Sequence, residues 1–319
     1  MRTALGKASP PTPDQGIEIR HDMITGKRDT VADASLLQRL HQNIRPALFH
    51  AFFHLMRAAS HGLDRLSSRL TLDFMEQLKV SVWRDAEAGG FARYDVPARD
   101  NQTVLDVVTH IQRELDPSLA YRFACRVGMC GSCAMTVNGR ARWTCRTHVR
   151  KVVGADGALE LRPLANLPVI RDLAADLAPF FDKWQRAQGF FQPKDAPDGA
   201  VPDEFAVVAP GSKARREADA GIECIGCAVC YASCDVVAWN GDYLGPAALN
   251  RAWTLVNDAR DGARGERLDA VAGDAGCHSC HSTRSCTERC PKQIDPSGAI
   301  AGLKRTLFWE SLFGGKRHG

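Results

Sequence analysis

The sequence predicts an α+β protein in which a small mixed domain precedes an all-helical domain, with a helical extension before both. Three observations support this prediction. Short runs of strand-forming residues are confined to about residues 77–165. Apolar residues elsewhere recur every three or four positions, which is helical spacing. All 12 cysteines lie between Cys125 and Cys290, so the two main domains carry them all.

The composition is that of an ordinary globular chain. Of its 319 residues, 45% are hydrophobic and 24% are charged, which is enough for two or three domains. Basic residues exceed acidic ones by 41 − 37 = 4, too few to indicate nucleic-acid binding. The cysteines are too closely spaced for disulfides, which bridge separated segments. They are typical of a reducing compartment, where clustered thiols hold metal.

The extension covers residues 1–75. Residues 1–34 are polar and rich in proline, so we expect a flexible arm. Residues 35–72 have helical spacing of apolar residues. The most apolar stretch, Pro46–Met56, is far shorter than the about 20 residues that span a bilayer. We therefore expect an amphipathic helix that docks on a partner or lies at a membrane surface, and we see no secretory signal or transmembrane helix.

The first domain is expected at residues 76–168. Its helix is predicted at Thr103–Leu115 from the spacing of its valines. Asn138-Gly139 is a strong signal for a two-residue hairpin turn. The predicted strands are Leu78–Trp83 and Phe91–Val96, the hairpin pair Ala134–Val137 and Ala141–Thr144, and a second hairpin pair, Lys151–Val153 and Ala158–Pro163.

The second domain is expected at residues 169–319, and its elements are predicted to be helices between cysteine loops. Leu167–Gly189 has helical spacing, and Pro193–Gly211 is rich in proline, aspartate and glycine, as linkers and surface loops are. Pro246–Asp258 and Ser297–Phe308 are the clearest helical segments.

The first cysteine set has the plant-type spacing of a [2Fe–2S] ferredoxin, C-x4-C-x2-C followed by a more distant cysteine. Small residues between the thiols, Gly128 and Gly131 among them, let backbone N–H groups approach the sulfurs. A zinc site would favour paired C-x2-C units instead. The predicted ligands are Cys125, Cys130, Cys133 and Cys145.

The second set has the C-x2-C-x2-C-x3-C spacing of two-cluster ferredoxins, in which the fourth cysteine binds the other cluster. The third set repeats the ending of such a run, Cys286-x3-Cys290-Pro291. We therefore expect Cys290 to complete the first [4Fe–4S] site. Its predicted ligands are Cys224, Cys227, Cys230 and Cys290.

The third cluster is expected to lack a fourth thiolate. Thr283 stands where a regular run would place a cysteine. The remaining ligands, Cys234, Cys280 and Cys286, suit a [3Fe–4S] cluster. Cys277 is an additional cysteine, interpreted as a free thiol near the cluster, as a fourth ligand that would make the third cluster [4Fe–4S], or as part of a contact with a partner.

These motifs, in this order, resemble the iron–sulfur subunit of succinate dehydrogenase and fumarate reductase over about residues 77–310. Further stretches are similar to the same family: Pro168–Leu173, Tyr243–Leu249 and Asp258–Asp261. Asp235 departs from it, because proline is usual after the last cysteine of the second set. The resemblance implies a β-grasp ferredoxin domain followed by a helical two-cluster domain.

The resemblance also implies the partners. Electrons would pass between an FAD-containing flavoprotein subunit and a quinone held at a membrane-anchor subunit, with this chain peripheral on the cytoplasmic side of the inner membrane. Trp239 and His281 match family positions beside the quinone. The clusters serve succinate oxidation and fumarate reduction alike. The alternatives are the iron–sulfur subunit of another flavin-dependent dehydrogenase and, from a different class, a redox-sensing metal-binding module.

Overall fold

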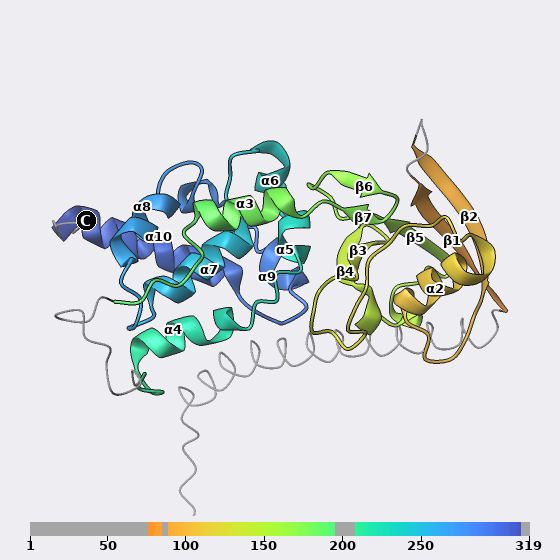
Figure 1. The fold of residues 1–319 in the computed structure, drawn as a ribbon, viewed down its shortest axis with the longest axis horizontal. Coiled ribbons are helices and arrows are strands. Elements are labelled where there is room, and N and C mark those ends of the chain that lie inside the picture. Colours follow the sequence, from red (N-terminus) through yellow and green to blue (C-terminus); the bar gives the residue numbers. More distant parts are fainter. Residues whose placement is uncertain (1–75, 85–88, 195–207, 314–319) are drawn as a thin grey trace, which may run out of the picture. The chain divides into compact units, whose positions relative to one another are not determined.

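The computed structural model describes residues 76–84, 89–194 and 208–313. The predicted arm and helix of residues 1–75 lie outside the described residues, as does most of the predicted loop at 193–211. Within the described ranges, the first part of the chain combines strands with a helix, and the part from residue 208 onward is helical (Figure 1).

A five-stranded sheet organises the first part, in the order β2-β1-β5-β3-β4. The central pair, β1 and β5, is parallel, and the other neighbours are antiparallel. The edge strands are therefore β2 and β4. The strands are β1 (Gln77–Arg84), β2 (Gly90–Pro97), β3 (Ala134–Val137), β4 (Arg140–Trp143) and β5 (Ala158–Arg162).

The core of this part lies between the sheet and helix α2 (Val104–His110). Alternate residues of β1, Leu78, Val80 and Val82, are fully buried, as the period of a strand requires. The helix begins at Thr103, whose hydroxyl accepts from the Asp106 backbone N–H while the Asp106 carboxylate accepts from the Thr103 N–H. The π-helical turn η1 (Ile111–Leu115) extends it, so the predicted helix is confirmed.

The predicted second hairpin is wrong in its first strand. Val149–Lys151 forms a 3-10 turn, η3, and the N–H groups of Val152 and Val153 both donate to the Val149 carbonyl. These donors are used locally, so no strand forms there. β5 pairs with β1 and β3 instead. The Asn138-Gly139 hairpin is confirmed, and η2 (Thr144–Arg146) follows its second strand.

The predicted helix at Leu167–Gly189 begins about ten residues late. Its first part forms a two-stranded sheet of β6 (Val169–Arg171) and β7 (Ala174–Ala175), joined by Asp172, which has a left-handed φ of 48°. Helix α3 then spans Ala178–Arg186, with a proline in its first turn. A proline is tolerated at that place because the first N–H groups of a helix have no internal partner.

Helix α7 (Pro246–Val256) is the central element of the helical part and is buried along almost its whole length. Helices α3, α4, α8 and α10 all contact it. The bounds of the remaining elements are α4 (Lys213–Ile222), α5 (Val229–Ala232), α6 (Asp235–Trp239), α8 (Arg264–Val271), η5 (Cys277–Ser279), α9 (Ser285–Arg289) and α10 (Pro296–Phe313). Among the described residues, no helix is long and apolar enough to cross a membrane.

The hydrophobic core of the helical part includes residues from the first part of the chain. Ala141 of β4, Leu164 and Leu167 pack into it beside residues of α5 and α7. Asn166, with a left-handed φ of 64°, donates from its amide to the carbonyls of Tyr231 (3.2 Å) and Cys234 (3.3 Å). The segment after β5 therefore anchors the backbone that carries the second cysteine set.

Candidate metal centres

The first cysteine set lies on an irregular loop before β3 and on the turn after β4. Arg126, Gly128 and Gly131 have left-handed φ values of 57°, 75° and 71°, which bend the backbone around one side of the loop. The N–H groups of Met129 and Cys130 point at the Cys125 sulfur, at 3.2 and 3.3 Å. The Cys145 N–H points at the Cys133 sulfur at 3.4 Å.

These backbone donors change the acidity of the thiols. The N–H groups of Val127, Cys130 and Met129 lower the pKa of Cys125 to about 6, because they favour the thiolate. Burial, with the neighbouring Cys133, raises the pKa of Cys145 to about 12. The loop thus favours the metal-binding thiolate form at Cys125, whereas Cys133 and Cys145 are buried thiols.

The second cysteine set encloses an apolar cavity. Cys224 follows α4, and Cys227 and Cys230 flank the start of α5, where Gly226 and Ala228 have left-handed φ values of 63° and 59°. The wall opposite is formed by Ala247, Ile294 and Pro296 among others. Cys290, which is 60 residues further along the chain than Cys230, lines the same cavity.

Burial raises the pKa of Cys224, Cys227 and Cys230, to about 12 for Cys227, and the nearby Cys290 raises all three further. Thiols crowded in an apolar cavity favour the neutral form. A metal centre that binds them as thiolates removes that penalty, so the donor set and its surroundings fit an iron–sulfur cluster.

Three of the four remaining cysteines form a second group around Cys234, the residue that precedes α6. Burial raises the pKa of Cys234, and the thiols of Cys286 and Cys280 raise it further. Cys286 is buried, and its pKa is raised in turn by burial and by Cys280. The structure thus brings Cys234, Cys280 and Cys286 together across 46 and 52 residues of sequence.

Tyr243 belongs to the same surroundings. It is 1% exposed, and its pKa is raised by burial and by Cys280, Cys234 and Cys286. The Lys304 ammonium of α10 donates to the Cys280 carbonyl at 2.8 Å. The cysteine spacing does not indicate either residue, because both lie outside it, and the sequence distinguishes Tyr243 only as part of the family-like stretch Tyr243–Leu249.

Cys277 differs from the three grouped thiols. It is fully buried in the helical core, on η5. Burial raises its pKa to about 11, while the Lys304 ammonium acts in the opposite direction. Cys280 raises the pKa of Cys277 further.

Among the described residues, no three or more His, Cys, Asp or Glu side chains converge closely enough to hold a single metal ion.

Trp239 and His281 lie in contact, from the end of α6 and from the residue after Cys280. Their rings pack edge to face, with centroids 5.7 Å apart and an interplanar angle of 79°. Trp239 is 67% exposed. The structure therefore presents an exposed aromatic and an imidazole beside the group that contains Cys234 and Cys280.

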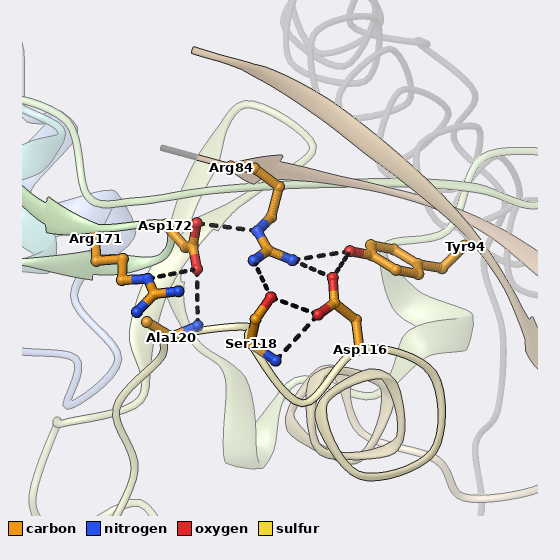
Figure 2. A network of polar contacts seen from close by, with 7 residues as sticks. All are labelled: Arg84, Tyr94, Asp116, Ser118, Ala120, Arg171 and Asp172. Carbon is orange, nitrogen blue, oxygen red and sulfur yellow. Dashed lines mark hydrogen bonds and ion pairs between the residues drawn. The ribbon is translucent and has the colours of Figure 1, made fainter. Parts of the chain in front are cut away.

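A partly buried polar network holds the backbone on which the first loop begins (Figure 2). Arg84, at the end of β1, donates to Asp172 (3.0 Å), to the Tyr94 hydroxyl (3.0 Å) and to the Ser118 hydroxyl (2.8 Å), and it also pairs with Asp116. Asp172 accepts from the Ala120 N–H at 2.8 Å. One arginine thus joins β1, the turn after η1 and the β6–β7 sheet.

Comparisons with known proteins agree with this geometry. The family described as 2Fe-2S iron-sulfur cluster binding domain matches residues 77–182, and that described as 4Fe-4S dicluster domain matches residues 223–295. The chain is 36% identical, over 240 residues, to a fumarate reductase iron-sulfur subunit of Mycobacterium tuberculosis, covering 74% of this chain and 94% of that protein.

Two further relatives have related names. The succinate dehydrogenase iron-sulfur subunit of Paracoccus denitrificans is 37% identical over 208 residues, covering 64% of this chain and 76% of that protein. A chain in the structure of the Mycobacterium smegmatis Sdh1 complex in the apo form superimposes with a TM-score of 0.65 at 28% identity, covering 75% of this chain and 98% of that chain.

Proposed function

This chain belongs to the iron–sulfur subunits of succinate dehydrogenase and fumarate reductase, and from that premise we propose which of its residues hold each of the three clusters. The chain is the electron-transfer part of an oxidoreductase and carries [2Fe–2S], [4Fe–4S] and third-cluster sites. The clusters, when bound, supply one-electron transfer. The protein's own contribution is to place the thiolates, surround them and position their neighbours.

The observation that carries the ligand assignment is the cavity shared by Cys290 and the second cysteine set. Cys224, Cys227, Cys230 and Cys290 hold the [4Fe–4S] cluster, and Cys125, Cys130, Cys133 and Cys145 hold the [2Fe–2S] cluster. The order of the strands, with α2 packed on the sheet, supports a β-grasp fold for the first domain at residues 76–168, followed by a helical domain at 169–319.

Cys234, Cys280 and Cys286 hold the third cluster, a [3Fe–4S] cluster. The effects of these thiols on one another's pKa values support this, together with the burial of Cys277 in the hydrophobic core of the helical part. Cys277 is a buried free thiol beside the cluster in this assignment. Tyr243 is buried beside these three thiols.

Exposed side chains beside the first and the third cluster sites indicate where the two partners bind. The tip of the first loop presents Val127 and Met129, 59% and 63% exposed, to the FAD-containing flavoprotein subunit. Trp239 and His281 face the quinone at the membrane anchor, where the indole N–H donates to a quinone oxygen and the imidazole relays a proton. The subunit is peripheral, on the cytoplasmic side of the inner membrane.

The test is a pair of serine variants of the intact complex, purified without oxygen and examined by EPR. Cys290→Ser removes or strongly perturbs the [4Fe–4S] signal and leaves the [3Fe–4S] signal of the oxidised protein. Cys234→Ser has the opposite effect. Cys277→Ala leaves the [3Fe–4S] signal near full intensity.

The reverse pattern, in which Cys290→Ser abolishes the third-cluster signal alone, contradicts the crossed assignment. A [3Fe–4S] signal that is absent from the oxidised wild type and appears in Cys277→Ala identifies Cys277 as a fourth ligand. In the alternative function, the chain is the iron–sulfur subunit of another flavin-dependent dehydrogenase. The clusters of the intact complex are then neither reduced by succinate nor oxidised by fumarate.

A further inference from the structure

Three arginines line a cavity where the sheet part and the helical part of the chain meet. The cavity has a volume of about 240 Å³. Arg140 and Arg142 come from β4, and Arg289 is the last residue of α9. Arg140 and Arg142 are two positions apart on one strand, so they emerge on the same face of it. No cysteine is among the lining residues, and Pro291 is the residue that this cavity shares with the cavity around Cys290.

The guanidinium groups in this cavity lack partners in the described part of the chain. The Nε atoms of Arg142 and Arg289 are buried and have no hydrogen-bond acceptor there. Glu288 also lines the cavity, but among the described residues no ion pair joins it to any of the three arginines. A buried donor left without an acceptor destabilises the fold, and more so when the group is charged.

Electrostatic repulsion adds to this cost. Burial lowers the pKa of Arg142, and the charges of Arg140 and Arg289 lower it further. Three guanidinium groups and one carboxylate leave the cavity with a charge of about +2. Several positive charges so close together are stabilised when a bound anion neutralises them and accepts their hydrogen bonds.

We propose that this cavity is a binding site for a dianionic oxyanion of the phosphate type, held between β4 and α9. The planar guanidinium fork matches the oxygens of such an anion and binds them in pairs. A water molecule takes about 30 Å³ of liquid volume, so the cavity has room for a phosphate ion and a few waters. The bound ion joins the strand that leads to Cys145 with the helix that leads to Cys290.

This site goes beyond the electron relay, because binding needs neither the flavoprotein nor the quinone. The test is isothermal titration calorimetry of the intact, cluster-loaded protein with inorganic phosphate, at constant ionic strength maintained with chloride. We expect saturable binding with one phosphate per chain, and a rise in the thermal unfolding temperature with phosphate that chloride at matched ionic strength does not produce.

The decisive variant is Arg142→Gln, which removes one charge and one buried donor. Its phosphate affinity falls about tenfold or more, the range expected when a charged hydrogen bond is lost. Arg140→Gln, at an exposed position of the same cavity, weakens binding to a smaller extent and guards against misfolding of the first variant.

The matched control is Arg150→Gln, which removes the same charge from the same part of the chain but breaks only the surface pair with Asp100. It binds phosphate as the wild type does. Two outcomes overturn the proposal: no saturable binding of phosphate by the wild type, or an equal loss of affinity in Arg150→Gln and Arg142→Gln, which indicates general charge screening.

Discussion

Gly131 is the residue at which the first and second cysteine loops meet. A Cβ atom at this position would lie 2.5 Å from the Cβ of Cys227 and 2.9 Å from its Cα. The φ of Gly131 is 71°, a left-handed value that other residues adopt at a cost. Position 131 therefore requires glycine for two reasons: the bend of the first cysteine loop and the close contact of that loop with the second cysteine loop.

We predict that Gly131→Ala separates the two loops. The backbone penalty of about 1 kcal/mol is accompanied by a steric clash worth about 1–3 kcal/mol. Iron content, EPR of the first and second clusters, and thermal stability measure the effect. Gly139→Ala is the control, because Gly139 has the same φ of 71° but nothing within 4 Å of an added Cβ; equal losses in both variants would refute the contact.

Hydrogen bonds to the Asp116 side chain stabilise its ionised form. The Ser118 hydroxyl and the Tyr94 hydroxyl hold the pKa of Asp116 well below its usual range, and Arg84 adds to the effect. In the unfolded chain the pKa returns to about 3.9. The stabilisation is therefore fully present above about pH 4 and is lost as the pH falls through the lower, folded-state pKa.

Asp116→Asn is expected to lower the free energy of unfolding by about 2 kcal/mol at neutral pH. Urea denaturation followed by circular dichroism measures this loss. The difference between variant and wild type narrows as the pH is lowered from 5 towards 3. Asp100→Asn, which loses only an exposed pair with Arg150, should cost less than about 1 kcal/mol; a pH-independent difference for Asp116→Asn would contradict the account.

At the scale of elements, a fully buried ion pair stabilises the helical part. It joins Arg267 of α8 to Asp261, which lies two positions before Ala263, the N-cap residue of that helix. Arg267 and Asp261 are joined at 2.5 and 3.1 Å, with both side chains 0% exposed. Arg267 also donates to the carbonyls of Gln188 and Phe190, beyond α3. Arg267 thereby joins the segment after α3 to the helical core. The ion pair also gives Asp261, the last residue of the family-like stretch Asp258–Asp261, a structural role.

Asp261→Asn should destabilise the helical part by about 3–5 kcal/mol, because it leaves a buried arginine charge without its counter-charge. Chemical denaturation and the retention of the [4Fe–4S] and third clusters measure the loss. Asp258→Asn is the control, since Asp258 pairs with Arg260, which is 44% exposed, and should cost about 1 kcal/mol. A similar small cost for both variants would show that the buried pair is not stabilising.

At the scale of the whole molecule, the described residues account for all 12 cysteines and for the contacts between the parts that carry them. Asn166, Gly131 and the apolar contact of Ala141 join the two parts. Within the described residues, the cluster-bearing region has two large hydrophobic cores, one under the sheet and one among the helices. The prediction for the extension follows from its sequence.

Deletion of residues 1–72 should leave all three clusters intact and loosen the attachment of the complex to membranes. Residues 1–75 have a charge of 10 − 7 = +3, and the apolar spacing of 35–72 suits a partner or a lipid surface. EPR of the truncated complex and its fraction in washed membranes provide the measurements. Loss of the clusters would place the segment in the chain's own core, and unchanged attachment would exclude an anchoring role.

Local patterns were sufficient to predict much of the fold. The strand predicted at Leu78–Trp83, the helix predicted at Thr103–Leu115 and the Asn138-Gly139 turn each depend on neighbours within a few residues, and the structure has all three. The failures have physical causes at longer range. Lys151–Val153 has strand-forming side chains, but its N–H groups are used by η3, and β5 has better partners in β1 and β3.

The sequence by itself determined the family, the three cysteine sets and the kinds of cluster they suit, because ligand spacing is a local property of the chain. Only the tertiary structure decided what lies around those sets. The cavity that Cys290 shares with Cys230, the buried Tyr243, the contact of Gly131 with Cys227 and the three arginines between β4 and α9 all join segments far apart in sequence. Such contacts depend on how the helices and strands pack, and residue spacing does not encode packing directly.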